Sequence, residues 1–228
     1  MDLPKIDNSN LWDKTYMILK ERIVRREFKP NQKLLIPELA VQLGVSRTPI
    51  RDALNRLEMD GLVKTVSKVG TFVCALEIED ILDIIDTRLM LELWVAEKIP
   101  SLSSAELADK IGKLEAILEQ STNSINQIPF GSYLRSDYNL LFHIEFINIG
   151  GNRRNTEIYL SMMNYHFLAA ENDLFTKEMV TSAIDQHYAI IDALKERNTD
   201  ALKAAINLHL DDSRIRLIKQ LQANGGKL

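Results

Sequence analysis

Three histidines in the second half of the chain are spaced to suit one metal ion. His187 lies 11 residues before Asn198, and His209 lies 11 residues after it. If these segments form an antiparallel helical hairpin that turns near Asn198, both imidazoles stand about three turns from the loop, at one height. With His143 on a third helix they would make a nitrogen-rich site, which favours Zn²⁺ or Ni²⁺ over Ca²⁺. The alternative is that each histidine is a core residue with ordinary hydrogen bonds.

A second group of residues could bind DNA. Arg47 and Arg51 are four residues apart, so a helix that begins after Ser46 presents both from one face. Ser46, Arg47 and Thr48 fall in its first turn, where free backbone N–H groups and the helix dipole favour a phosphate or a base acceptor. An arginine fork can bond guanine O6 and N7 in the major groove. The alternative is that these arginines are only solvated surface charges.

The surrounding elements predict a winged helix-turn-helix. Apolar spacing predicts helices over 11–28, 36–43 and 47–60, with Gly44 ending the second and Ser46 capping the third. Two β-rich segments, 62–66 and 71–76, then form a hairpin. At its tip Lys68 can meet a phosphate, and Gly70 lets the backbone approach the DNA closely.

The rest of the chain predicts an all-α six-helix bundle, so the fold class is mainly α. Breaks at proline, glycine and polar stretches divide it into six helices: 77–99, 103–120, 132–149, 152–173, 177–197 and 199–222. We therefore expect a DNA-binding domain over 1–76 and an effector-binding and dimerisation domain over 77–228.

Charge and composition agree with this division. Residues 1–76 contain 13 Lys and Arg against 9 Asp and Glu, whereas residues 77–228 contain 15 against 23. A basic front and an acidic body suit a chain that touches phosphate with one part only. No segment has the length and apolarity of a membrane span, no signal peptide is seen, and a single cysteine, Cys74, cannot form an internal disulfide. We expect a cytoplasmic protein.

The segment SRTPIRDALNRLEMDGLV, followed by GTFV, resembles the GntR family of bacterial transcription regulators over roughly residues 11–76. The resemblance implies that Arg47 and Arg51 contact the operator and that Gly70 lies at the minor groove. Family members often have a further basic residue where this chain has Pro37.

Residues 77–222 resemble the FCD-type (VanR-like) effector domain of the FadR subfamily. The resemblance implies a metal held by Asp-x-x-x-His on one helix and by two further histidines on the last two helices. His143, His187 and His209 match the histidines, but Asn139 stands where the family has Asp. It also implies that Arg88 can clamp a small carboxylate beside the metal, although Arg88 could instead form a surface pair with Glu92. His166 matches no ligand and is interpreted as pocket wall.

We therefore expect a metabolite-responsive regulator, most often a repressor in this family, that binds a palindromic operator as a homodimer. A metal sensor, in which the ion itself is the signal, is the second hypothesis. A metal-dependent enzyme tethered to DNA is the third, but no carboxylate is evidently placed as its base. Neither G-x-S-x-G nor a phosphate-binding glycine loop is present.

Overall fold

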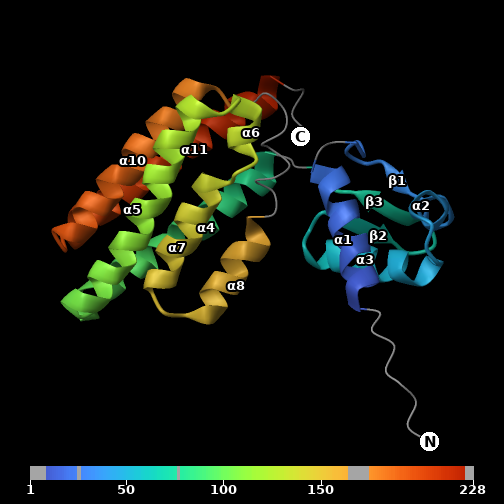
Figure 1. The fold of residues 1–228 in the computed structure, drawn as a ribbon, viewed down its shortest axis with the longest axis horizontal. Coiled ribbons are helices and arrows are strands. Elements are labelled where there is room, and N and C mark those ends of the chain that lie inside the picture. Colours follow the sequence, from blue (N-terminus) through green and yellow to red (C-terminus); the bar gives the residue numbers. More distant parts are fainter. Residues whose placement is uncertain (1–8, 25–26, 76–77, 164–174, 224–228) are drawn as a thin grey trace, which may run out of the picture. The chain divides into compact units, whose positions relative to one another are not determined.

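The computed structural model describes residues 9–24, 27–75, 78–163 and 175–223 (Figure 1). The chain divides into two compact units, Met1–Leu76 and Glu77–Leu228. Helices dominate both units, which agrees with the mainly α fold class. No helix within the described ranges combines the length and apolarity needed to cross a membrane.

The first unit is a winged helix-turn-helix. Its helices are α1 (Ser9–Val24), α2 (Ile36–Leu43) and α3 (Arg47–Met59), and its strands are β1 (Lys33–Leu34), β2 (Val63–Val66) and β3 (Gly70–Val73). The strands form an antiparallel sheet in the order β1-β3-β2. Gly44 follows α2 with a left-handed φ of 65°, so the chain turns sharply into α3.

Three expectations for this unit need correction. The first helix is described as far as Val24 and does not reach Phe28, because the N–H groups of Glu27 and Phe28 both bond back to the Arg22 carbonyl. The strand β1 was missed, since two residues are too few to show alternation. Ser46 stands at the N-cap of α3 with extended backbone, but its side chain makes no capping hydrogen bond.

The second unit is a bundle of helices (Figure 1). The described elements are α4 (Ile78–Lys98), a 3-10 turn (Ile99–Ser101), α5 (Ser104–Gln127), α6 (Phe130–Leu134), α7 (Tyr138–Ile149), α8 (Arg153–Met162), α10 (Lys177–Lys195) and α11 (Thr199–Ala223). α11 packs against both α4 and α10, and α5 packs against both α7 and α10. This packing encloses the apolar core and brings α4, α7, α10 and α11 around one buried point.

Three helices differ from the sequence-based ones. The helix expected over 152–173 ends at Met162 in the described residues, and residues 164–173 of that prediction lie outside them. The polar stretch after Gln120 remains helical, because Ser121 and Ile125 are buried on the inner face of α5 and Ser121 is hydrogen-bonded to Tyr133. The helix expected over 132–149 is two helices, α6 and α7. Asp137 separates them, since its φ of 52° lies in the left-handed region and cannot continue a helix.

Candidate metal and effector site and DNA-reading helix

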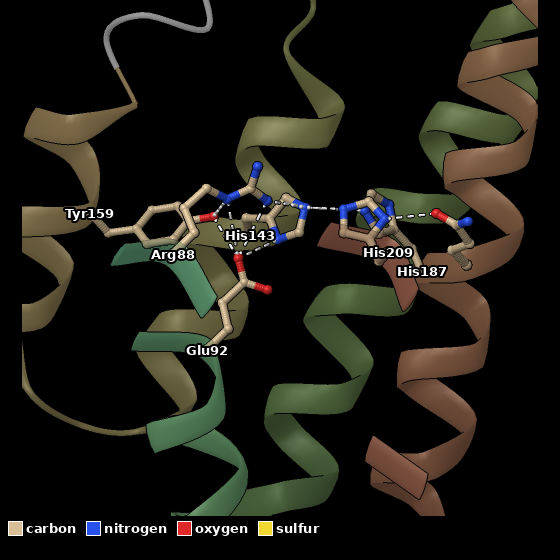
Figure 2. Close-up of polar contacts among 7 residues, drawn as sticks. Arg88, Glu92, His143, Tyr159, His187 and His209 are labelled. Carbon is tan, nitrogen blue, oxygen red and sulfur yellow. Dashed lines mark hydrogen bonds and ion pairs between the residues drawn. The ribbon is translucent and has the colours of Figure 1, made fainter. Parts of the chain in front are cut away.

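The three histidines singled out by their spacing meet inside the second unit. His143 lies on α7, His187 on α10 and His209 on α11, and all three side chains are buried. The Nε2 atom of His143 lies 3.0 Å from Nε2 of His209 and 3.2 Å from Nε2 of His187. Figure 2 shows the three rings converging edge to edge. They offer three nitrogen ligands from three helices at one point.

The hairpin of α10 and α11 places two of these rings. The turn lies at Arg197 and Asn198, and the Asn198 side chain accepts a hydrogen bond from the N–H of Ala201 at the start of α11. Because His187 and His209 are equally distant from this turn, their ring centroids come within 4.6 Å. Phe142 stacks on the His187 ring with centroids 4.1 Å apart, which fixes that ring from α7.

Hydrogen bonds to the rings of His143 and His209 indicate which ring nitrogen carries the proton. Arg88 Nη2 is 3.1 Å from His143 Nε2, and a guanidinium can only donate, so Nε2 accepts and the ring proton is on Nδ1. That Nδ1 lies 3.3 Å from a carboxylate oxygen of Glu92. Likewise His209 Nδ1 donates to the Gln186 side-chain oxygen at 3.0 Å, because the Gln186 amide nitrogen is bound to Asp212.

The Nε2 atom of His143 is therefore an acceptor that Arg88 Nη2 and the Nε2 atoms of His187 and His209 all approach, at distances of 3.0 to 3.2 Å. Burial keeps His187 and His209 neutral: desolvation, followed by the neighbouring histidines, lowers the pKa of His209 well below its usual value. Desolvation lowers the pKa of His187 in the same way, and His143 and Arg88 add to it. Neutral imidazoles that share a point are the form that binds metal.

A buried polar network surrounds His143 (Figure 2). Arg88 Nε donates to the Tyr159 hydroxyl at 3.0 Å, and this hydroxyl donates to Glu92 Oε1 at 2.9 Å. Arg88 Nη2 also lies 3.3 Å from Glu92 Oε1. Arg88 is 2% exposed and Glu92 is fully buried. Arg88 therefore does pair with Glu92, but the pair is buried, so the alternative of a surface pair is wrong.

A cavity of about 100 Å³ opens beside the histidines. Its polar lining residues include Arg88, Asn139, His187, His209 and Arg216. Its apolar lining residues include Val180, Ile184 and Leu217. Asp137 also lines the cavity, and desolvation raises the pKa of its carboxyl group to about 6. The arrangement suits a small amphiphilic ligand held at a cationic end.

In the first unit, α3 presents the residues expected to read DNA. Ser46, Arg47, Thr48 and Arg51 are exposed, whereas Ile50, Leu54 and Leu57 on the other face are buried. Within the described part of the chain, neither Arg47 nor Arg51 is committed to an ion pair. The outer face of α3 is thus free for a nucleic acid to dock on.

The tip of the hairpin between β2 and β3 has the geometry of a wing. Lys68 is exposed and has a φ of 60°, and Gly70 has a φ of 143°. A β-carbon at Gly70 would meet only the movable end of the Lys33 side chain, so it is the backbone conformation that favours glycine at this position.

Comparison with known proteins identifies both units. The model for bacterial regulatory proteins of the gntR family matches residues 11–73, and the model for the FCD domain matches residues 83–212, more than half of the chain. The chain belongs to the GntR family. It is a DNA-binding transcription regulator with a C-terminal FCD domain, and not an enzyme.

Similar GntR-type regulators span most of the chain. The HTH-type transcriptional regulator YdhC of Bacillus subtilis is 28% identical over 86% of this chain and 86% of its own. The Nta operon transcriptional regulator of Aminobacter aminovorans is 28% identical over 82% and 85%. The gluconate operon transcriptional repressor of Bacillus licheniformis is 26% identical over 85% and 79%.

Solved GntR structures share the fold. A transcriptional regulator GntR from Rhodococcus sp. RHA1 has a TM-score of 0.67, with 22% identity over 92% of this chain and 98% of that one. McbR/YncC of E. coli also has a TM-score of 0.67, with 21% identity over the same shares.

Sequence reasoning missed four residues of this FCD domain's site. Glu92 was considered only as a surface partner, and Tyr159, Gln186 and Asp137 were not considered. Gln186 precedes His187 directly, and an amide beside a candidate ligand is a signal that could have been followed. Tyr159 lies 71 residues after Arg88, so only the packing of α8 on α4 reveals it. His166, the expected pocket wall, lies outside the described residues.

Proposed function

We propose that this regulator is a repressor whose operator affinity is set by a small carboxylate bound beside a divalent metal in the FCD domain. His143, His187 and His209 would hold the metal, with Asn139 as a further donor, and Arg88 would bind the carboxylate. The observation that carries the proposal is the meeting of three buried imidazoles, two of which, His187 and His209, lie on the wall of a cavity that also carries Arg88.

The donor set fits a tetrahedral metal such as Zn²⁺, or Ni²⁺. Ligand nitrogens about 2.05 Å from tetrahedral zinc are about 3.3 Å apart, close to the 3.0 and 3.2 Å between these Nε2 atoms. Glu92 and Gln186 stand behind the rings of His143 and His209 as the orienting groups that metal-bound histidines usually have. When bound, the metal supplies a fixed positive charge that attracts an anion.

Asn139 favours an anionic ligand. Three histidines and an asparagine are all neutral, so the site would keep the full charge of a divalent ion, which an aspartate would have partly cancelled. Arg88 adds a second cation with a planar pair of donors that matches a carboxylate. The Glu92 carboxylate balances the charge of the Arg88 guanidinium and holds this group in place. Arg88 lines the cavity and Glu92 does not.

α4 provides the physical link between the two units. It carries Arg88 and Glu92, and its first residue, Ile78, follows the last residue of β3 by five positions. A ligand that draws Arg88 away from Tyr159 or His143 would change how α4 packs, and the DNA-reading unit is attached to that helix. The ligand would then change the populations of DNA-competent and incompetent dimers.

DNA selection followed by binding assays tests the proposal. The full-length protein is used to select binding sites from random DNA, and the affinity for the selected site is measured by fluorescence anisotropy with Zn²⁺, with chelator, and with a panel of carboxylates. We expect a palindromic site, loss of binding in Arg47→Ala, and weaker binding when a carboxylate is added to the metal-loaded protein. Met17→Ala, an exposed change on α1 of the same unit, serves as the control.

The same assay separates this proposal from metal sensing. If metal alone changes operator affinity and no carboxylate adds to the effect, the ion is the signal and the carboxylate proposal is wrong. If His187→Ala and His209→Ala bind zinc as well as the wild type does, the metal site itself is refuted.

A further inference from the structure

The cavity beside the histidines contains a carboxylate that nothing in the described chain uses. Asp137 lines the cavity and is half-buried. It occupies the N-cap position of α7, where an aspartate usually accepts hydrogen bonds from the first N–H groups of the helix, but its side chain makes no such bond. Within the described residues it is also the carboxylate of the cavity wall.

The backbone holds this carboxylate in place at some cost. Asp137 has a φ of 52°, a left-handed conformation that is unfavourable for residues with a side chain. Two hydrogen bonds fix it: its N–H bonds the Leu134 carbonyl, and its own carbonyl accepts from the N–H of Leu141. Residues kept in such conformations cluster at ligand sites, because the surrounding structure must maintain them.

The cations of the wall are already partly balanced by neighbouring groups. Arg88 is bound to Glu92, Tyr159 and His143, and Arg216 pairs with Asp212 at 3.7 Å. A ligand that was only anionic would therefore bring a second negative charge toward Asp137 in a partly desolvated cavity, which is unfavourable. A ligand with a positive group near Asp137 would instead satisfy both ends of the cavity.

We propose that the effector is a small amino carboxylate and that Asp137 selects it by binding its ammonium group. Its carboxylate would lie toward Arg88 and the histidine cluster, and its carbon chain would lie along Val180, Ile184 and Leu217. This inference rests on the proposed carboxylate function and narrows the ligand class from carboxylates to zwitterions.

A matched ligand panel tests this inference on the full-length, zinc-loaded protein. The panel contains the common α-amino acids and the unbranched ω-amino acids of three to six carbons, each with its analogue that lacks the amino group. Dissociation constants are measured by calorimetry. We expect at least one amino carboxylate to bind tenfold or more tightly than its analogue, because a partly desolvated charge pair contributes at that level.

Asp137→Asn is the decisive variant, and Asp185→Asn, an exposed change on α10, is its control. We expect Asp137→Asn to reduce the preference for the amino ligand to threefold or less while the analogue binds as well or better. A preference that persists in Asp137→Asn overturns the inference. So does a loss of zinc affinity in Asp137→Asn, which would make Asp137 a metal ligand.

The outcomes also separate this inference from the function on which it rests. If carboxylates bind but no amino member is preferred, the inference is wrong and the carboxylate proposal stands. If neither class binds to the zinc-loaded protein, both are wrong.

Discussion

At the scale of single residues, the histidine site depends on side chains that lie behind the imidazole rings and are not themselves candidate ligands. Gln186 accepts the Nδ1–H of His209 and thereby turns the lone pair of Nε2 toward the other two histidines. Glu92 places a carboxylate oxygen 3.3 Å from Nδ1 of His143, without a hydrogen bond to it, and also balances the charge of Arg88. A buried histidine without such a partner could adopt either tautomer, and only one of them can bind metal in this direction.

Gln186→Ala is therefore expected to weaken zinc binding about tenfold, although Gln186 is not a ligand. The ring of His209 keeps its position in α11 but loses the acceptor that fixes its tautomer. Competition with a chromogenic zinc chelator measures the change. Gln120→Ala, an exposed glutamine on α5, is the matched control and should leave zinc affinity unaltered. Equal zinc affinity in both variants would show that Gln186 has no orienting role.

The histidines also set how stability depends on pH in the metal-free protein. Burial lowers the pKa of His187 and His209 well below 6.5, whereas in the unfolded chain both take up protons near pH 6.5. The unfolded state therefore binds more protons below that pH, and the free energy of unfolding should decrease as pH falls from 7.5 to 5.5. Each histidine contributes about 1.4 kcal/mol per pH unit once the pH is well below 6.5.

Urea unfolding in the presence of a chelator at several pH values measures this slope. In His187→Gln, the free energy of unfolding should depend less steeply on pH, by the contribution of one histidine. Asp137 contributes equally to both proteins, so its opposite effect cancels when the two slopes are subtracted. That carboxyl group has a raised pKa of about 6, so it favours the native state as the pH falls through the same range. Parallel pH profiles for the two proteins would contradict the buried, neutral state of His187.

At the scale of elements, the sequence predicts periodic helices well and local interruptions poorly. The hairpin of α10 and α11 could be predicted, because two equal spacings about Asn198 place His187 and His209 side by side. The end of α5 could not be predicted, because the polar residues after Gln120 are typical of a loop. Only the structure shows that Ser121 is buried and hydrogen-bonded to Tyr133. The left-handed turn at Asp137 has no glycine to signal it.

Two glycines in the FCD domain give opposite predictions for the same substitution. A β-carbon at Gly150, which ends α7, would lie 2.4 Å from the Trp94 ring on α4, whereas at Gly112 in α5 nothing lies within 4 Å. We expect Gly150→Ala to destabilise the fold by about 1–3 kcal/mol through the forced shift of α7 from α4. Gly112→Ala should stabilise it by about 0.5–1 kcal/mol, because alanine loses less entropy in a helix. Urea unfolding of both variants measures these changes, and the same sign in both would disprove the steric reading of Gly150.

At the scale of the whole molecule, regulation requires the DNA site and the effector site to bias one equilibrium. Linkage then makes the effect reciprocal: if a carboxylate weakens operator affinity by some factor, the operator must weaken carboxylate affinity by the same factor. We expect a factor of 5–150, the usual range of such coupling. Calorimetric titration of the carboxylate into zinc-loaded protein, with and without saturating operator, gives one factor, and anisotropy gives the other.

Arg51→Ala, which should lose operator contact but keep the cavity intact, ought to bind the carboxylate equally well with and without the DNA. A coupling factor of one in both titrations, with the carboxylate bound, would contradict regulation of operator binding through this cavity.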